Sequence, residues 1–170
     1  MRAWRLLKPI LVLPGTVLVL VPSVILFAFR NTHYAQELAA PDRFFFWLAL
    51  AAAGPGLFLA AWTVMLFTKF GRGTPAPWDP PQKLVVRGPY RYVRNPMITG
   101  VLFMLASEAL LFQSRPIFFW LLFFFLLNIL YFPLFEEKSL EKRFGADYLE
   151  YKKHVPRWIP SLTPWNPPER

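Results

Sequence analysis

The sequence contains no cysteine, only two histidines and little charge. The lack of cysteine excludes disulfide bonds, thiolate metal ligands and cysteine nucleophiles. The two histidines, His33 and His154, are too few for a multi-histidine metal site, so we expect no bound metal. Charged residues make up 17% of the chain, whereas 55% is hydrophobic and 18 residues are phenylalanine. This composition is too apolar for an ordinary soluble domain of this length and indicates side chains that face lipid.

Long apolar stretches separated by polar segments each predict a membrane-spanning helix. The four stretches are Pro9 to Phe29, Phe44 to Phe67, Ile98 to Phe112 and Ile117 to Phe135. The first follows basic residues, as the core of a signal peptide does, but no small-residue cleavage site comes after it, so we expect a retained helix. Residues 113–116 alone separate the last two stretches, which should therefore form an antiparallel hairpin. We predict an all-α polytopic membrane protein with four transmembrane helices and a C-terminal helical hairpin.

Lysine and arginine are distributed unevenly among the polar segments. Three precede the first stretch, six lie between Lys69 and Arg94, and seven follow Phe135, whereas segments 30–43 and 113–116 carry two and one. Because cytoplasmic loops are enriched in these residues, both termini and the central loop should face the cytoplasm. The net charge of +9 then fits contact with anionic headgroups. No basic stripe lies on a soluble module, so we expect no nucleic-acid partner.

By length, the chain should form a single membrane domain, residues 1–170. Within it we distinguish an N-terminal two-helix part, a Pro-rich connector, a core that contains the hairpin, and a tail. These parts cover residues 1–72, 73–81, 82–160 and 161–170.

Two polar and aromatic segments adjoin the hairpin, and both should emerge on the same side of the membrane. The first, residues 87–100, leads into the third helix. The second, residues 136–157, leaves the fourth helix and reads as a helical extension that Gly145 interrupts. Because the hairpin reverses the chain, we expect the two segments to lie close together. Taken separately, the first could be an interfacial anchor and Glu136-Glu137 could begin an ordinary soluble helix.

Short motifs follow one another around the hairpin in a fixed order. They are Gly88-Pro89-Tyr90, Arg94-Asn95-Pro96-Met97-Ile98-Thr99-Gly100, Glu136-Glu137, Phe144-Gly145-Ala146-Asp147-Tyr148 and Tyr151 to Pro156. Together, between Gln82 and Pro160, they resemble the isoprenylcysteine carboxyl methyltransferase and phospholipid methyltransferase family of integral membrane enzymes. Asn95 stands where that family usually has His, and Ile98 where it usually has Tyr. Asn95 keeps hydrogen-bonding capacity but cannot transfer a proton, and Ile98 offers only packing.

The resemblance implies a methyltransferase that binds S-adenosylmethionine in cytoplasmic segments. The residues that it assigns to the cofactor are Gln82, Lys83, Leu84, Val85, Tyr90, Arg94, Asn95, Pro96, Met97, Ile98, Glu136 and Glu137. Among these, Glu136 should bind the polar part of the cofactor, and the resemblance does not decide between it and its neighbour Glu137. Arg91, Tyr92 and Phe132 are assigned to the substrate. Family members that process prenylcysteines carry Arg where this chain has Phe132, which argues against that substrate.

We therefore expect methyl transfer to a lipid-like or apolar acceptor, first a phospholipid amine and next a thiol or carboxylate. No general base is assigned, although His154 could serve if it is not simply interfacial. The alternative is a non-catalytic membrane scaffold or lipid-binding protein that keeps the hairpin; a small transporter has less support. Glu108, inside the third stretch, could be functional but is expected to have a structural partner such as Asn128.

Overall fold

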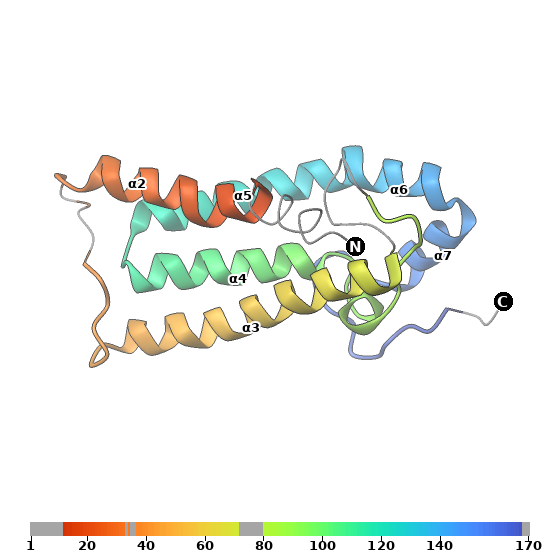
Figure 1. The fold of residues 1–170 in the computed structure, drawn as a ribbon, viewed down its shortest axis with the longest axis horizontal. Coiled ribbons are helices and arrows are strands. Elements are labelled where there is room, and N and C mark those ends of the chain that lie inside the picture. Colours follow the sequence, from red (N-terminus) through yellow and green to blue (C-terminus); the bar gives the residue numbers. More distant parts are fainter. Residues whose placement is uncertain (1–11, 33, 35–36, 72–79, 168–170) are drawn as a thin grey trace. The chain divides into compact units, whose positions relative to one another are not determined.

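The computed structural model describes residues 12–32, 34, 37–71 and 80–167. The start of the first predicted span, residues 9–11, and most of the Pro-rich connector, residues 73–79, lie outside the described residues. Within the described ranges all regular secondary structure is helical and no strand occurs, which confirms the all-α class (Figure 1).

The helices are long in the apolar stretches and short after them. In chain order, the α-helices are α2 Val21–Phe29, α3 Phe44–Leu66, α4 Pro96–Leu111, α5 Arg115–Tyr131, α6 Glu137–Phe144 and α7 Ala146–His154. Three short π-helical segments are η1 Thr16–Leu20, η2 Phe67–Gly71 and η4 Phe132–Glu136, and one 3₁₀ turn is η3 Gly88–Arg91. Because η2 and η4 continue α3 and α5 without a break, the helical runs extend beyond the apolar stretches.

Three helical runs are long and apolar enough to cross a membrane: Val12–Phe29, Phe44–Gly71 and Arg115–Phe144. Large apolar side chains on them are exposed, among them Phe44 at 73% and Phe119 at 66%, as expected for faces that contact lipid. The 16-residue α4 is about 24 Å long, less than the ~30 Å of a hydrocarbon layer. The described part of the chain thus has three helices of spanning length, and the fourth crossing stays a prediction.

The chain forms two compact units. The first contains Met1–Phe58 and Gly100–Leu126, and the second contains Leu59–Thr99 and Leu127–Arg170. The first unit therefore holds most of the apolar helices, and the second holds both polar segments that flank the hairpin.

In the first unit, α3 and α4 approach closely at a glycine. A Cβ atom on Gly56 would lie 2.8 Å from Cγ of Met104 and 3.0 Å from the carbonyl oxygen of Gly100. Small residues of this kind let membrane helices pack backbone to backbone. The indole nitrogen of Trp120 on α5 donates a hydrogen bond to the carbonyl of Val17 over 3.1 Å, which ties α5 to the first helix.

The predicted hairpin is present (Figure 1). A three-residue turn, 112–114, joins α4 to α5, and Gln113 takes a positive φ of 47° there. The turn is closed by the amide of Ser114, which donates to the carbonyl of Ala109 over 2.9 Å. In the last turn of α4, the Glu108 oxygen Oε2 is buried and has no hydrogen-bond partner in the described residues. The proposed pairing of Glu108 with Asn128 involves both units and stays a prediction.

In the second unit, the predicted helical extension of α5 turns a corner. Gly145, with φ 53° and ψ −129°, separates α6 from α7. One apolar cluster joins the two helices despite the corner. Its buried residues are Tyr148, Tyr151 and Val155, and the side chains packed against them include Leu140 and Phe144.

Gly88 opens the 3₁₀ turn η3 and should resist substitution. Its φ is +55°, and a Cβ atom would lie 2.9 Å from the Trp62 ring and 3.1 Å from Leu66. We expect Gly88→Ala to lower the free energy of unfolding by about 2–3 kcal/mol, from backbone strain and crowding together. Thermal unfolding in detergent measures this change. Gly145→Ala is the control without crowding, because its φ is +53° but nothing lies within 4 Å, so only the backbone cost of about 1–3 kcal/mol should appear.

Candidate functional site

The two polar segments meet in the second unit through a buried ion pair. Arg94 lies two residues before α4, and Glu137 is the first residue of α6. The Arg94 nitrogen Nη1 lies 2.9 Å from the Glu137 oxygen Oε1, and the two side chains are only 10% and 4% exposed. The proximity expected from the hairpin is thus found in the structure.

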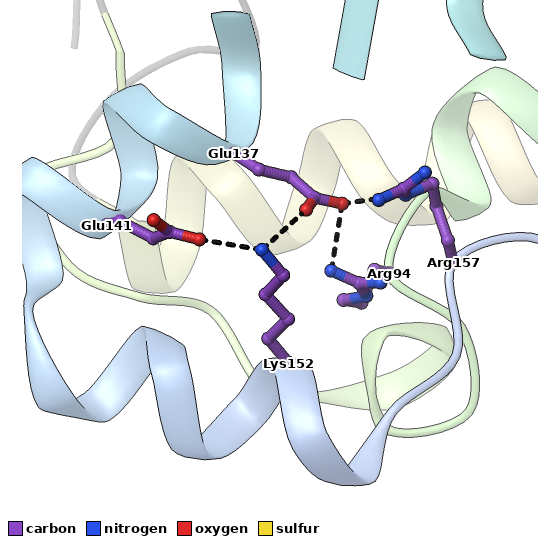
Figure 2. Close-up of polar contacts among 5 residues, drawn as sticks. All are labelled: Arg94, Glu137, Glu141, Lys152 and Arg157. Carbon is purple, nitrogen blue, oxygen red and sulfur yellow. Dashed lines mark hydrogen bonds and ion pairs between the residues drawn. The ribbon is translucent and has the colours of Figure 1, made fainter. Parts of the chain in front are cut away.

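Glu137 is the centre of a larger charge cluster, which Figure 2 shows. Nε of Arg157 lies 2.7 Å from its Oε1, and Nζ of Lys152 lies 3.0 Å from its Oε2. Lys152 also contacts Oε1 of Glu141 over 2.7 Å, and its pKa is raised by this bond and then by Glu137. Three cations therefore share two carboxylates, and the cluster has a formal charge of +1. Both oxygens of Glu137 are occupied, so its arrangement is that of a structural anchor.

Glu136 differs from its neighbour. Among the residues that the structure describes, no donor forms a hydrogen bond or ion pair with its partly buried carboxylate, and the charge that acts on it is that of Arg143. The pKa of Tyr90 is raised by burial, then by Tyr151 and then by the charge of Glu136, which places Glu136 near Tyr90. The structure therefore separates the two acids that the sequence left unranked: Glu137 contacts three cations, whereas Glu136 forms no hydrogen bond or ion pair with a described residue.

Two hydrogen-bond donors beside the cluster are buried without an acceptor in the described residues. They are Nε of Arg94 and Nδ2 of Asn95. The backbone carbonyl of Asn95 is occupied, because it accepts hydrogen bonds from the amide and the hydroxyl of Thr99 over 3.1 and 3.0 Å at the start of α4. Buried donors are normally paired, so unpaired neighbours of this kind indicate a place for an acceptor-bearing ligand.

Buried tyrosines support the site from the α7 side. The hydroxyl of Tyr151 donates to the carbonyl of Tyr90 over 2.7 Å. Burial raises the pKa of Tyr151, and burial followed by the Glu137 charge raises that of Tyr148. Both hydroxyls therefore stay protonated at neutral pH, and the bond fixes the Tyr90 backbone against α7.

Removal of this bond should weaken the fold measurably. Tyr151→Phe leaves the buried carbonyl of Tyr90 without its donor, and we expect a loss of about 1–2 kcal/mol in unfolding free energy. Chemical or thermal unfolding in detergent checks the value. Tyr92→Phe is the control, since Tyr92 is 37% exposed, and a change within about 0.5 kcal/mol is expected there. Equal losses in the two variants would contradict a specific role for the bond.

The remaining residues assigned to the cofactor fall into two groups. In the first, the amides of Gln82 and Lys83 both donate to the carbonyl of Gly71, while Leu84 and Val85 pack into the two tyrosine-containing clusters. In the second, Pro96, Met97 and Ile98 form the first turn of α4. All of them lie in the second unit, and their contact with a cofactor stays a prediction.

The residues assigned to the substrate are spread more widely. Arg91 donates from Nε to the carbonyl of Trp165 over 3.2 Å and from Nη2 to Asn166, so it fastens the C-terminal segment. Tyr92 is exposed, and Phe132 packs edge-on against Trp158 with ring centroids 5.8 Å apart.

His154, the possible base, is held outside the cluster. Its ring stacks on Trp165 at 5.2 Å with an angle of 8° between the planes, and its Nδ1 lies 2.9 Å from the carbonyl of Glu150. These contacts give His154 a packing role.

Lys152 and Arg157 belong to the cluster but were not among the predicted site residues. A signal for Lys152 exists in the sequence. If Gly145 is read as a reversal, positions about equally far from it face each other, and Glu137 and Lys152 lie eight and seven residues away. Arg157 follows Pro156, where the chain leaves α7, and no pattern in the sequence directs its side chain toward Glu137.

Comparison with known proteins places the chain in a family. The family model described as phospholipid methyltransferase matches residues 44–147, which is well over half of the chain. The match begins earlier than the resemblance seen in the motifs, at the start of α3, and it includes Arg94, Asn95, Glu136 and Glu137. Searches of curated proteins and of solved structures found no match. Together with the three helices of spanning length, the match makes this a membrane methyltransferase. The chain belongs to the phospholipid methyltransferase family.

Proposed function

We propose that the protein transfers a methyl group from S-adenosylmethionine to a lipid-like acceptor, with a phospholipid amine as the first candidate and a thiol or carboxylate as the next. The family match over residues 44–147 is the observation that carries this proposal. Further support comes from the segments that flank the hairpin, which carry Glu136 and the unpaired donors of Arg94 and Asn95 in the second unit.

The residues present fit this cofactor. S-adenosylmethionine carries a carboxylate, hydroxyls and ring nitrogens that accept hydrogen bonds, and the buried donors of Arg94 and Asn95 have no acceptor of their own in the described chain. It also carries an ammonium and a sulfonium, and Glu136 offers a carboxylate that has the charge of Arg143 nearby but no ion pair with a described residue. The net positive cluster around Glu137 favours the carboxylate end of such a ligand.

When bound, the cofactor supplies an electrophilic methyl group. Glu136 would hold the cationic part, while Arg94 and Asn95 would hold the carboxylate or hydroxyl oxygens. The apolar first turn of α4 would exclude water from the reacting face. Because no described residue is positioned as a general base, the acceptor would have to present an unprotonated nucleophile, and orientation would supply most of the rate acceleration.

We further propose that both chain termini and the central loop face the cytoplasm. The lysine and arginine counts of the segments support this orientation. A reporter fused after Arg170 tests it, because only a cytoplasmic signal agrees with the proposal.

Ligand-induced stabilisation and product formation test the proposed function. Purified protein in lipid nanodiscs should be stabilised by S-adenosylmethionine and by its demethylated product, by about 2.7 kcal/mol at a hundredfold excess over Kd. With an isotopically labelled methyl donor and a lipid extract, label should enter an aminophospholipid fraction.

Stabilisation without labelled lipid would favour a different acceptor. Absence of both effects would reject the proposal in favour of a non-catalytic lipid-binding protein. As a control for the ligand, S-adenosylmethionine should stabilise the protein, whereas an equal concentration of ATP, which shares its adenosine, should not.

A further inference from the structure

Residues 156–166, here called the strap, lie along the first polar segment. Their backbone follows residues 91–94 through a series of hydrogen bonds. The amide of Arg94 donates to the carbonyl of Pro156 at 2.9 Å. The amide of Ser161 donates to the carbonyl of Tyr92 at 2.9 Å, and the amide of Trp165 donates to the carbonyl of Arg91 at 3.0 Å. The strap is thus held at both ends and in the middle.

The outer side of the strap is unusually apolar for an exposed loop. Ile159 is 81% exposed and Leu162 is 100% exposed, although their neighbours Pro156 and Trp165 are partly buried. Ile159 and Leu162 lie between the bonded residues Pro156, Ser161 and Trp165, so the backbone that carries both exposed side chains is held in place. Two large aliphatic side chains presented together on a fixed loop indicate a contact surface.

The strap adjoins the C-terminal part of a spanning helical run. Trp158 packs edge-on against Phe132, at 87° between the ring planes. Phe132 belongs to the run Arg115–Phe144, which is apolar enough to cross a membrane, and the next turn of that run exposes Leu134 at 51% and Phe135 at 63%. The strap therefore packs on a spanning run at a point where the run exposes apolar side chains.

The composition of the strap matches the boundary between hydrocarbon and headgroups. Tryptophan is enriched at this depth, because its ring is apolar and its N–H is polar. A protein partner would not require that exposed aliphatic side chains adjoin the end of a spanning run, so the phospholipid bilayer is the occupant that the observations favour.

We propose that the strap is inserted in the membrane interface, with Ile159 and Leu162 in the outer acyl region of the phospholipid bilayer. The bilayer then holds the strap against residues 91–94 and supports the segment that carries Arg94. This inference does not depend on methyl transfer, since it concerns a surface outside the proposed cofactor site.

The absence of cysteine makes the test direct. Single variants Leu162→Cys and Ile159→Cys can each be labelled with a polarity-sensitive bimane, with Lys153→Cys as the exposed control on α7. Labelled protein is reconstituted in phosphatidylcholine vesicles that contain phospholipids with a nitroxide near the top of the acyl chain. The emission of the two strap labels should be shifted to the blue relative to the free dye in buffer, and the nitroxide lipids should quench it. The Lys153→Cys label should instead be quenched by iodide in the aqueous phase.

Strap labels that respond to iodide and not to nitroxide lipids, as the control does, would overturn the proposal. A label shielded from both quenchers would also overturn it, since the side chain would then be covered by protein. Because both replaced side chains are exposed, the variants should unfold at the temperature of the unlabelled protein in detergent, which verifies the fold. No methyl donor is present in this experiment, so its failure and failure of the proposed function are distinguishable.

Discussion

Glu137→Gln should lower the free energy of unfolding by about 3–5 kcal/mol, the largest stability effect expected of any single substitution in the second unit. The substitution keeps the shape of the side chain but removes the charge that Arg94, Lys152 and Arg157 share. Lys152 and Arg157 are 36% and 27% exposed and can regain water, but Arg94 is only 10% exposed and would keep an unpaired charge. Unfolding in detergent, followed by circular dichroism, measures the loss.

Glu141→Gln is the matched control for this prediction. Among the described residues, the Glu141 carboxylate pairs only with Lys152, and its side chain is 33% exposed, so a loss of no more than about 1 kcal/mol is expected. A double-mutant cycle with Arg94→Gln separates the pair from the rest of the cluster, and a coupling of about 1–3 kcal/mol should appear. Similar small losses for Glu137→Gln and Glu141→Gln would show that the cluster does not support the fold.

Much of the fold could be predicted from the sequence, because membrane helices follow from apolar length. The hairpin follows from the short polar gap before Arg115, and the meeting of the two polar segments follows from the hairpin. The corner at Gly145 was foreseen only as an interruption of a helix. A positive φ at glycine changes the direction of the chain, but the sequence does not state the direction that it will take.

Less of the candidate site could be predicted. The sequence places Glu136 and Glu137 side by side, and both are equally acidic residues of one helical run. Their difference arises from the 100° step between successive helical residues, which turns Glu137 toward Lys152 and Arg157. Those two cations come from α7 and the strap, and their positions depend on the corner and on the backbone bonds of the strap, which no local pattern encodes.

Glu136→Gln should leave the fold intact and remove the response to the cofactor. Its carboxylate pairs with no described residue, so the unfolding free energy should change by no more than about 0.5 kcal/mol. Loss of a charge that faces the cation of a ligand costs about 3 kcal/mol, so affinity for S-adenosylmethionine and the rate of methyl transfer at low cofactor should fall about a hundredfold. Ligand-induced thermal stabilisation and incorporation of labelled methyl groups measure the two effects.

The pair of neighbouring amide variants makes this prediction specific to Glu136. Glu137→Gln should lower stability first and affect the cofactor only through loss of folded protein, so a lower temperature should restore its stabilisation by S-adenosylmethionine. Glu136→Gln should not be rescued by cooling, whereas Glu136→Asp, which keeps the charge, should recover part of the response. If Glu136→Gln is stabilised like the wild type while folded Glu137→Gln is not, the saturated carboxylate binds the ligand, and the cations around it must then move apart to admit the cofactor.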